Sequence, residues 1–246
     1  MSSVWAIGRR ELASMFRTPV GWVVIALFLL LTGAAFSVGL VPGQPASLRD
    51  FFAVSAWLLM PVAPAVSMRL FAEEHRTGAI EPLLTAPVSD AGAVAGKYLG
   101  AWLFLALMVA PTLLYPAVLW WVADPKPDLG QIGAGYVSLV LQGSLYLAIG
   151  TAVSAMTSSQ TLAYLATLLP ILGLLLVSRG ASDSSLGGSG PMPEWARRTL
   201  QALSIPARAS DFARGIIDTA HIAFFLVAAL WCLFAAHAAL DSRRWR

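Results

Sequence analysis

The stretch MRLFAEEHRTGAIEPLLTAPVSD, Met68 to Asp90, lies between two long apolar runs. Before it reaches Asp90 it carries five charged side chains, Arg69, Glu73, Glu74, Arg76 and Glu81. At the centre of a lipid bilayer each charge would cost roughly 2.5–3.5 kcal/mol, so together about 12–17 kcal/mol. We therefore expect residues 71–90 to lie outside the hydrocarbon, between two membrane spans.

The composition of the whole chain agrees with this expectation. Of its 246 residues 58% are hydrophobic and 12% are charged, and the mean hydropathy is +0.73. Soluble domains carry about 25% charged residues, so this composition predicts an all-α integral membrane protein. The net charge of +3 is small and scattered, which argues against a nucleic-acid partner. A single cysteine, Cys232, excludes a disulfide framework.

Charge-free runs mark the membrane spans, since one span needs about 20 apolar residues. The first such run has 31 residues, between Arg17 and Arg49. A run of 50 residues, between Asp128 and Arg179, is too long for one helix and divides at MTSSQT, residues 156–161. The six expected spans are about 19–41, 51–70, 98–122, 132–155, 161–178 and 219–240.

An even number of spans places both termini on one side of the membrane. The two terminal segments are rich in arginine, whereas the short loops on the opposite side carry only Arg49 and Lys126. The positive-inside rule therefore predicts cytoplasmic termini. The loop at 179–218, which this orientation places outside, nevertheless holds five arginines.

The segment before the first span, SVWAIGRRELASMFR, has amphipathic helical spacing. Trp5, Leu12 and Phe16 fall on one helical face, and Arg9 and Arg17 fall on the other. This pattern predicts a helix over residues 1–18 that lies in the membrane interface. A soluble lead-in segment is the alternative.

The second half of the polar segment, GAIEPLLTAPV, also predicts a short helix. Ile80, Leu83 and Leu84 recur at helical spacing, Pro82 suits a first turn, and Pro87 ends the helix. Exposed leucines in a loop of this length suggest a docking surface for another protein. A loop helix packed against its own spans is the alternative.

Two motifs that suggest enzymes are set aside. GAVAGKY, residues 92–98, lacks the spacing and the Ser or Thr of a phosphate-binding loop. Its glycines, Gly92, Gly96 and Gly100, instead form a small-residue stripe suited to close helix packing. GGSG, residues 187–190, lies in a flexible Gly/Ser-rich run where no base would be held near Ser189.

The stretch at 69–90 resembles the segment between the second and third spans of ABC-2 type transporter permeases. The tail FARGIIDTAHIAFFLVAALWCLFAAHAALDSRRWR, residues 212–246, is similar to the gliding-motility and nitrous-oxide-reductase-maturation branch of that family. This resemblance implies one transmembrane domain over 1–246 in the bacterial inner membrane. Its parts are the interfacial helix (1–18), spans one to five (19–178), an external loop (179–218), the last span (219–240) and a cytoplasmic tail (241–246).

The resemblance also implies a cytoplasmic coupling helix that sits in a cleft of a separate ATPase. On this sequence the helix would comprise Thr77, Gly78, Ala79, Ile80, Glu81, Pro82, Leu83, Leu84 and Thr85. Ile80, Leu83 and Leu84 would fill the cleft, and Glu81 would pair with a basic group of the ATPase. Arg69, Glu73 and Glu74 would lie at the inner mouth of the second span, in the ionic contacts of an inward gate.

The external loop contains two stretches with helical apolar spacing, PEWARRTLQAL (193–203) and SDFARGIID (210–218). This loop resembles the short external re-entrant helices that cap the transport pathway in ABC-2 permeases. Packing of Trp195, Leu200 and Leu203 on the outer leaflet or on a second permease is the alternative.

The resemblance therefore implies the permease subunit of an ABC transporter, with no enzyme site or cofactor of its own. It would pair with itself or a related permease and with two ATPase subunits, which bind ATP and Mg²⁺. An accessory periplasmic or membrane protein is compatible with this assembly, and lipid surrounds it. Movement of the coupling helices would repack spans one, two and five and give alternating access, in the direction of export.

Two other classes of membrane protein are also compatible with the sequence. The first is a channel or scaffold that works without an ATPase. The second is an intramembrane enzyme, which needs clustered polar residues, whereas the spans hold isolated ones such as Gln142, Ser144 and Thr167. Because the expected spans contain no charge apart from Arg69 at the end of the second, an amphipathic, lipid-like or peptide cargo is compatible with the sequence, as is a mechanical role without cargo.

Overall fold

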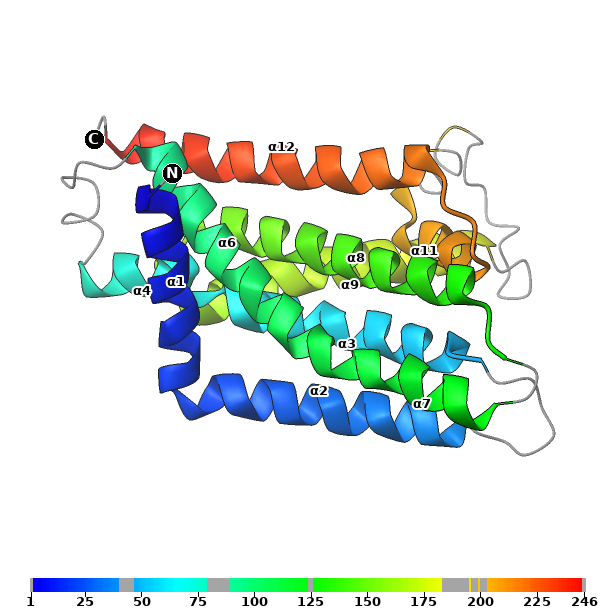
Figure 1. Ribbon diagram of the computed structural model, residues 1–246. Coiled ribbons are helices and arrows are strands. Elements are labelled where there is room, and N and C mark those ends of the chain that lie inside the picture. Colours follow the sequence, from blue (N-terminus) through cyan, green and yellow to red (C-terminus); the bar gives the residue numbers. More distant parts are fainter. Residues whose placement is uncertain are drawn as a thin grey trace.

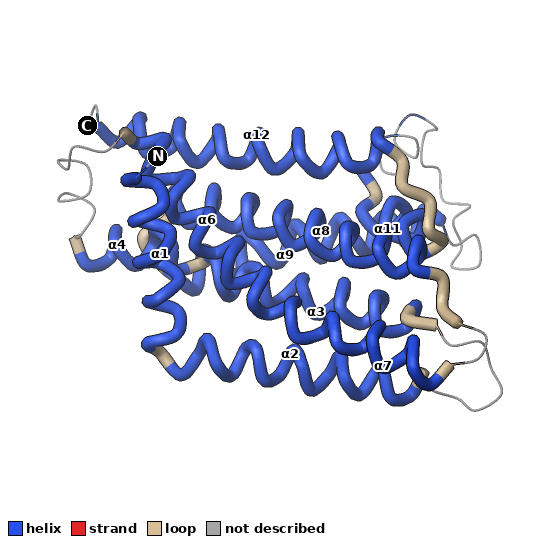
Figure 2. Tube along the Cα trace, viewed as in Figure 1, coloured by secondary structure: helices blue, strands red, loops and turns tan. Residues whose placement is uncertain are grey.

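A computed structural model describes residues 2–39, 47–78, 89–123, 126–182, 195, 199 and 203–244. In these ranges the regular structure is helical throughout, and the helices are joined by short connections (Figure 2). In chain order they are α1 (Ser2–Arg17), α2 (Pro19–Val38), α3 (Arg49–Ser67), α4 (Arg69–Thr77), α6 (Asp90–Val109), the 3₁₀ helix η1 (Ala110–Leu113), α7 (Leu114–Val122), α8 (Leu129–Met156), α9 (Gln160–Ser182), α11 (Ile205–Ala213) and α12 (Thr219–Arg244).

Six helical segments are long and apolar enough to cross a membrane, which confirms the predicted fold class. They are Pro19–Val38, Arg49–Thr77, Asp90–Val122, Leu129–Met156, Gln160–Val177 and Thr219–Ser242. The helical segments that hold the second and third predicted spans extend beyond the predicted bounds. The second continues through the polar residues to Thr77, and the third begins at Asp90, eight residues before the expected start at 98.

The third span changes from an α-helix to a tighter 3₁₀ helix along its length. It begins early because the Ser89 hydroxyl accepts a hydrogen bond from the Gly92 amide and so caps the helix. Near its middle, η1 replaces α-helical turns and contains Pro111, which lacks an amide hydrogen. The segment therefore consists of α6, η1 and α7 in succession.

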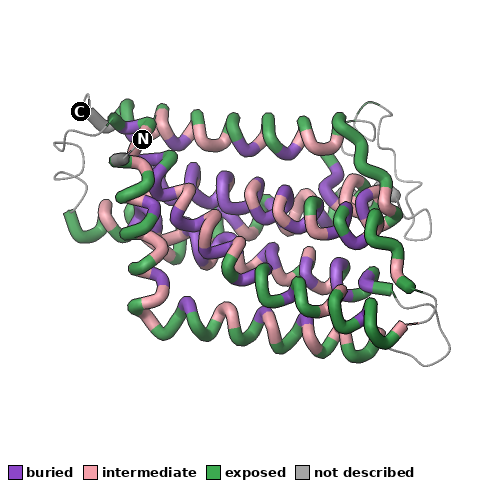
Figure 3. Tube along the Cα trace, viewed as in Figure 1, coloured by how far each residue is buried: buried purple, intermediate pink, exposed green. Residues whose placement is uncertain are grey.

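Helix α8 forms the centre of the bundle. It packs against α3, α4, α6, α9, α11 and α12, and most of its side chains are buried (Figure 3). By contrast, α2 and α12 expose large apolar side chains such as Leu30 and Trp231 along most of their length. Such outer faces fit a surrounding of lipid acyl chains or of a second membrane subunit.

Helix α1 lies across one end of the bundle, crosswise to the spans (Figure 1). The sharp corner between α1 and α2 requires Gly21, since a Cβ there would lie 2.3 Å from the carbonyl oxygen of Met15. Leu12 and Phe16 pack against the core, while Trp5 is 56% exposed. Both ends of the described chain lie at this end of the bundle, and α11 lies at the other (Figure 1).

Candidate functional site

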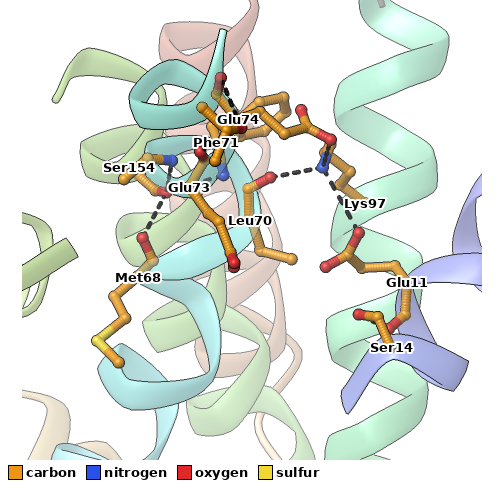
Figure 4. A network of polar contacts seen from close by, with 11 residues as sticks. Glu11, Ser14, Met68, Leu70, Phe71, Glu73, Glu74, Lys97 and Ser154 are labelled. Carbon is orange, nitrogen blue, oxygen red and sulfur yellow. Dashed lines mark hydrogen bonds and ion pairs between the residues drawn. The ribbon is translucent and has the colours of Figure 1, made fainter. Parts of the chain in front are cut away.

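Helix α4 follows α3 after a break at Met68, and a side chain from α8 fills this break. The amides in the first turn of a helix find no carbonyl partner within that helix, and Met68 supplies no side-chain cap for α4. The Ser154 hydroxyl accepts hydrogen bonds from the amides of Phe71 and Ala72, both at 3.0 Å, and donates one to the Met68 carbonyl at 2.9 Å (Figure 4). Helix α8 therefore caps α4.

A buried lysine holds the other side of α4. Lys97, on α6, is 3% exposed. Its Nζ donates to the Leu70 carbonyl at 2.5 Å and lies 2.8 Å from Glu74 Oε1 (Figure 4). The same ammonium lies 5.1 Å from the centre of the Phe71 ring, within cation–π range. Helix α6 is thus bound to α4 through both side chain and backbone.

The Lys97 ammonium also reaches the interfacial helix. Its Nζ lies 3.5 Å from Oε2 of Glu11 on α1, so one cation joins carboxylates from two helices (Figure 4). The second oxygen of Glu74, Oε2, is buried and has no hydrogen-bond partner among the described residues. Removal of Lys97 would leave both carboxylates poorly solvated and unpaired, which is costly in a largely buried site.

Two further contacts hold α4 at its ends. The ring Nε2 of His75 lies 3.1 Å from the Ala155 carbonyl oxygen at the end of α8, a distance that fits a hydrogen bond. Arg69 Nη1 donates to the Thr18 hydroxyl, at the corner between α1 and α2, at 3.4 Å. Helix α4 is therefore attached directly to α6, to α8 and to Thr18 before α2, and through Lys97 it is linked to α1.

Helix α4 ends at Thr77, the first of the predicted coupling residues, and Gly78, the second, is its C-cap. Gly78 has φ of 73°, the left-handed conformation that glycine adopts most easily when it terminates a helix. Thr77 is exposed, and its hydroxyl donates to the Glu73 carbonyl. The remaining predicted coupling residues lie outside the described part of the chain: Ala79, Ile80, Glu81, Pro82, Leu83, Leu84 and Thr85.

The three predicted gate residues are not brought together. Arg69 reaches Thr18, Glu74 reaches Lys97, and Glu73 is exposed with no ion-pair partner among the described residues. Because these side chains leave α4 in different directions, their ionic contacts run to neighbouring helices and not to each other. Their role as a gate stays a prediction.

Two of the three glycines in the predicted packing stripe face α1. A Cβ on Gly96 would lie 2.8 Å from the Ile7 Cβ, and a Cβ on Gly100 would lie 2.8 Å from the Gly8 carbonyl oxygen. Gly92 is partly buried, and its amide takes part in the cap of α6. The stripe therefore lets the interfacial helix approach α6 closely enough for Glu11 to reach Lys97.

Sequence reasoning missed Lys97, Ser154 and Glu11. Lys97 was used to mark a span boundary, and the spans were expected to be free of charge; the structure instead buries Lys97 within the third membrane-spanning segment. The available signal was a lone lysine among glycines and apolar residues, since a charge in that setting faces a partner inside the bundle. No comparable signal marks Ser154.

Comparison with known proteins agrees with this architecture. Residues 44–188 match the model of the ABC-2 family transporter protein. The chain is 28% identical over 172 residues to the probable ABC transporter permease protein NosY of Pseudomonas aeruginosa, an alignment that covers 65% of this chain and 62% of that relative. The chain thus spans less than two thirds of that relative's length. The predicted family is confirmed, while the branch within it stays a prediction. With a family match over more than half of its length and six apolar helices arranged as an integral membrane bundle, this chain belongs to the ABC-2 transporter family.

Proposed function

We propose that this chain is the membrane-spanning permease subunit of an ABC transporter, driven by a separate ATPase through residues 77–85. The observation that carries the proposal is the anchoring of α4. This helix leads into the predicted coupling segment. It is bonded to α8 through Ser154 and to α6 through Lys97, and Lys97 links it in turn to Glu11 on α1. A displacement of the coupling segment would therefore reach the centre of the bundle.

The route of this displacement follows the contacts of α4. Ser154 and Ala155 would carry it to α8, which touches most of the other spans. Lys97 would carry it to α6, and Glu11 to α1. Nucleotide binding by two ATPase subunits would shift the population of such a bundle between inward-open and outward-open arrangements, with no chemistry in this chain. The proposed assembly contains two permeases, identical or related, and works as an exporter.

The test is retention of the ATPase. The chain is co-expressed with the tagged ABC ATPase encoded nearest to its gene and is purified in a neutral detergent. Leu83→Asp and Leu84→Asp should each abolish co-purification, because a charge would enter an apolar cleft. Leu129→Asp is the matched control, since Leu129 is 62% exposed and begins α8 at the opposite end of the bundle.

The control should retain the ATPase as well as the unchanged chain does. Retention of the ATPase by both Leu83→Asp and Leu84→Asp would contradict coupling through this segment. An unchanged chain that retains no ATPase at all would favour a channel or scaffold that works without one.

A further inference from the structure

A cavity of about 230 Å³ lies inside the bundle, at the end that carries α11. Its walls come from α3, α8, α9 and α11 of one chain, and it opens to the surface on one side. A single water needs only about 10–15 Å³ of such space, so the cavity has room for part of a larger molecule. None of its walls belongs to the α4 site described above.

The lining changes in character along the cavity. At the rim lies Arg49, which is exposed and forms no ion pair with any described residue. Phe52, Leu139 and Leu175 provide apolar walls. Ser138, Gln142 and Tyr146 recur at helical spacing on one face of α8 and reach the buried end. The lining residues of α8, from Gly135 to Tyr146, extend over about 16 Å along the helix axis.

The buried end of the cavity offers hydrogen-bond donors without acceptors. Gln142 donates from Nε2 to the Ser138 hydroxyl oxygen at 2.9 Å, which leaves its second amide hydrogen available. No described group accepts a hydrogen bond from the hydroxyls of Ser138 and Tyr146, although Tyr146 is only 1% exposed. Buried polar groups are nearly always paired. Together with the Gln142 side-chain oxygen, these hydroxyl and amide groups can bind the polar part of a ligand that brings acceptor oxygens.

We propose that this cavity binds an anionic phospholipid-type amphiphile. Its phosphate pairs with Arg49, its ester oxygens accept hydrogen bonds from Ser138, Gln142 and Tyr146, and one acyl chain packs along the apolar walls. Arginine is suited to phosphate because its planar donors match two oxygens at once. The volume of about 230 Å³ holds at most part of one acyl chain, the rest of which leaves through the open side, so the ligand is either a single-chain lipid or one chain of a bilayer lipid.

The proposal rests on the cavity alone and does not depend on the coupling of α4 to an ATPase. Its test uses the full chain, purified in dodecyl maltoside and stripped of lipid, without any ATPase. Binding of palmitoyl-lysophosphatidylglycerol is measured by native mass spectrometry and by the rise in thermal midpoint. Palmitoyl-lysophosphatidylcholine, which carries no net charge, is the reference ligand.

Arg49→Gln should weaken binding of lysophosphatidylglycerol about tenfold, the effect of losing a charge-assisted hydrogen bond. Tyr146→Phe removes one oxygen, preserves the ring and should weaken binding about fivefold. Matched controls are Arg214→Gln and Tyr164→Phe, which change the same side chains away from the cavity and should bind normally. A variant is used only when its elution and its ligand-free thermal midpoint match those of the unchanged chain.

The source of the ligand is identified by a second titration with phosphatidylglycerol in nanodiscs. If the unchanged chain retains phosphatidylglycerol and the Arg49→Gln variant does not, the ligand is a lipid of the bilayer. Binding of the single-chain lipid alone identifies an amphiphile that enters from outside the bilayer. The proposal is wrong if Arg49→Gln and Tyr146→Phe bind lysophosphatidylglycerol like the unchanged chain, or if lysophosphatidylcholine binds as tightly.

Discussion

The ammonium of Lys97 meets carboxylates from α1 and α4 and a backbone carbonyl of α4. Pairs of this kind add little net stability when compared with apolar residues of the same size, but loss of one partner is costly because the other stays buried. Glu11 and Glu74 keep 17% and 22% of their side-chain surface exposed, so solvent offsets part of that cost. The value of Lys97 thus lies in fixing three helices in one arrangement.

Replacement of Lys97 by methionine should destabilise the chain by about 3 kcal/mol, since it leaves two carboxylates without their cation. For a chain of this length that corresponds to a fall of about 6–12 °C in the thermal midpoint measured in detergent. The same change at Lys126, an exposed residue at the other end of the bundle, should alter the midpoint far less. Adding Glu74→Gln to Lys97→Met should restore part of the loss. Equal midpoints for the two single variants would show that the ionic contacts of Lys97 do not matter.

At the scale of elements, charge-free runs predicted all six spans but not the continuation of the second into α4. A helix that continues through Arg69, Glu73 and Glu74 needs partners from elsewhere, and these come from distant parts of the chain. Ser154, which caps α4, is 83 residues from Phe71 in sequence. A charge such as Lys97 does not by itself end a helix, and the helix that holds the third span begins at Asp90, before Lys97. Neither the contact of Ser154 with α4 nor that of Lys97 with α4 can be predicted from a local sequence pattern.

Contact between α1 and α6 depends on the small residues of both helices. Gly100→Ala would place a methyl group 2.8 Å from the Gly8 carbonyl oxygen and 2.7 Å from the Glu11 Cβ, so α1 must shift. We expect a loss of about 1–3 kcal/mol, measured as a lower thermal midpoint. Gly133→Ala is the matched control, because a Cβ there meets nothing within 4 Å and should stabilise the helix by about 0.5–1 kcal/mol. Identical midpoints for both variants would contradict close packing at Gly100.

At the scale of the molecule, the described chain begins and ends at the end of the bundle that holds α1 and α4, while α11 and the donor-rich cavity lie at the other (Figure 1). The even number of predicted spans had placed both termini on the same side of the bundle. The cavity could not be predicted, because Ser138, Gln142 and Tyr146 look isolated in sequence. They come together with Arg49 only when α8 packs against α3. Which end faces the cytoplasm follows from the arginine distribution and stays a prediction.

Labelling of single cysteines tests the orientation. Cys232 is first replaced by alanine, and a thiol is then introduced by Ser242→Cys or by Lys126→Cys, two exposed positions at opposite ends of the bundle. In intact cells a membrane-impermeant maleimide should label the thiol at position 126. The thiol at position 242 should react only after the membrane is permeabilised. The reverse pattern would show that α1 and α4 face the exterior and would exclude contact with a cytosolic ATPase.

The Ser154 cap has a consequence for electrical insulation. A break in a membrane-spanning helix normally recruits solvent to its freed amides and carbonyls, and a file of solvent molecules conducts protons. Here a hydroxyl from α8 bonds two of the amides and one carbonyl at the start of α4 directly. Ser154 thus takes the place that solvent would otherwise fill at the joint between α3 and α4, and these three backbone groups need no file of solvent molecules.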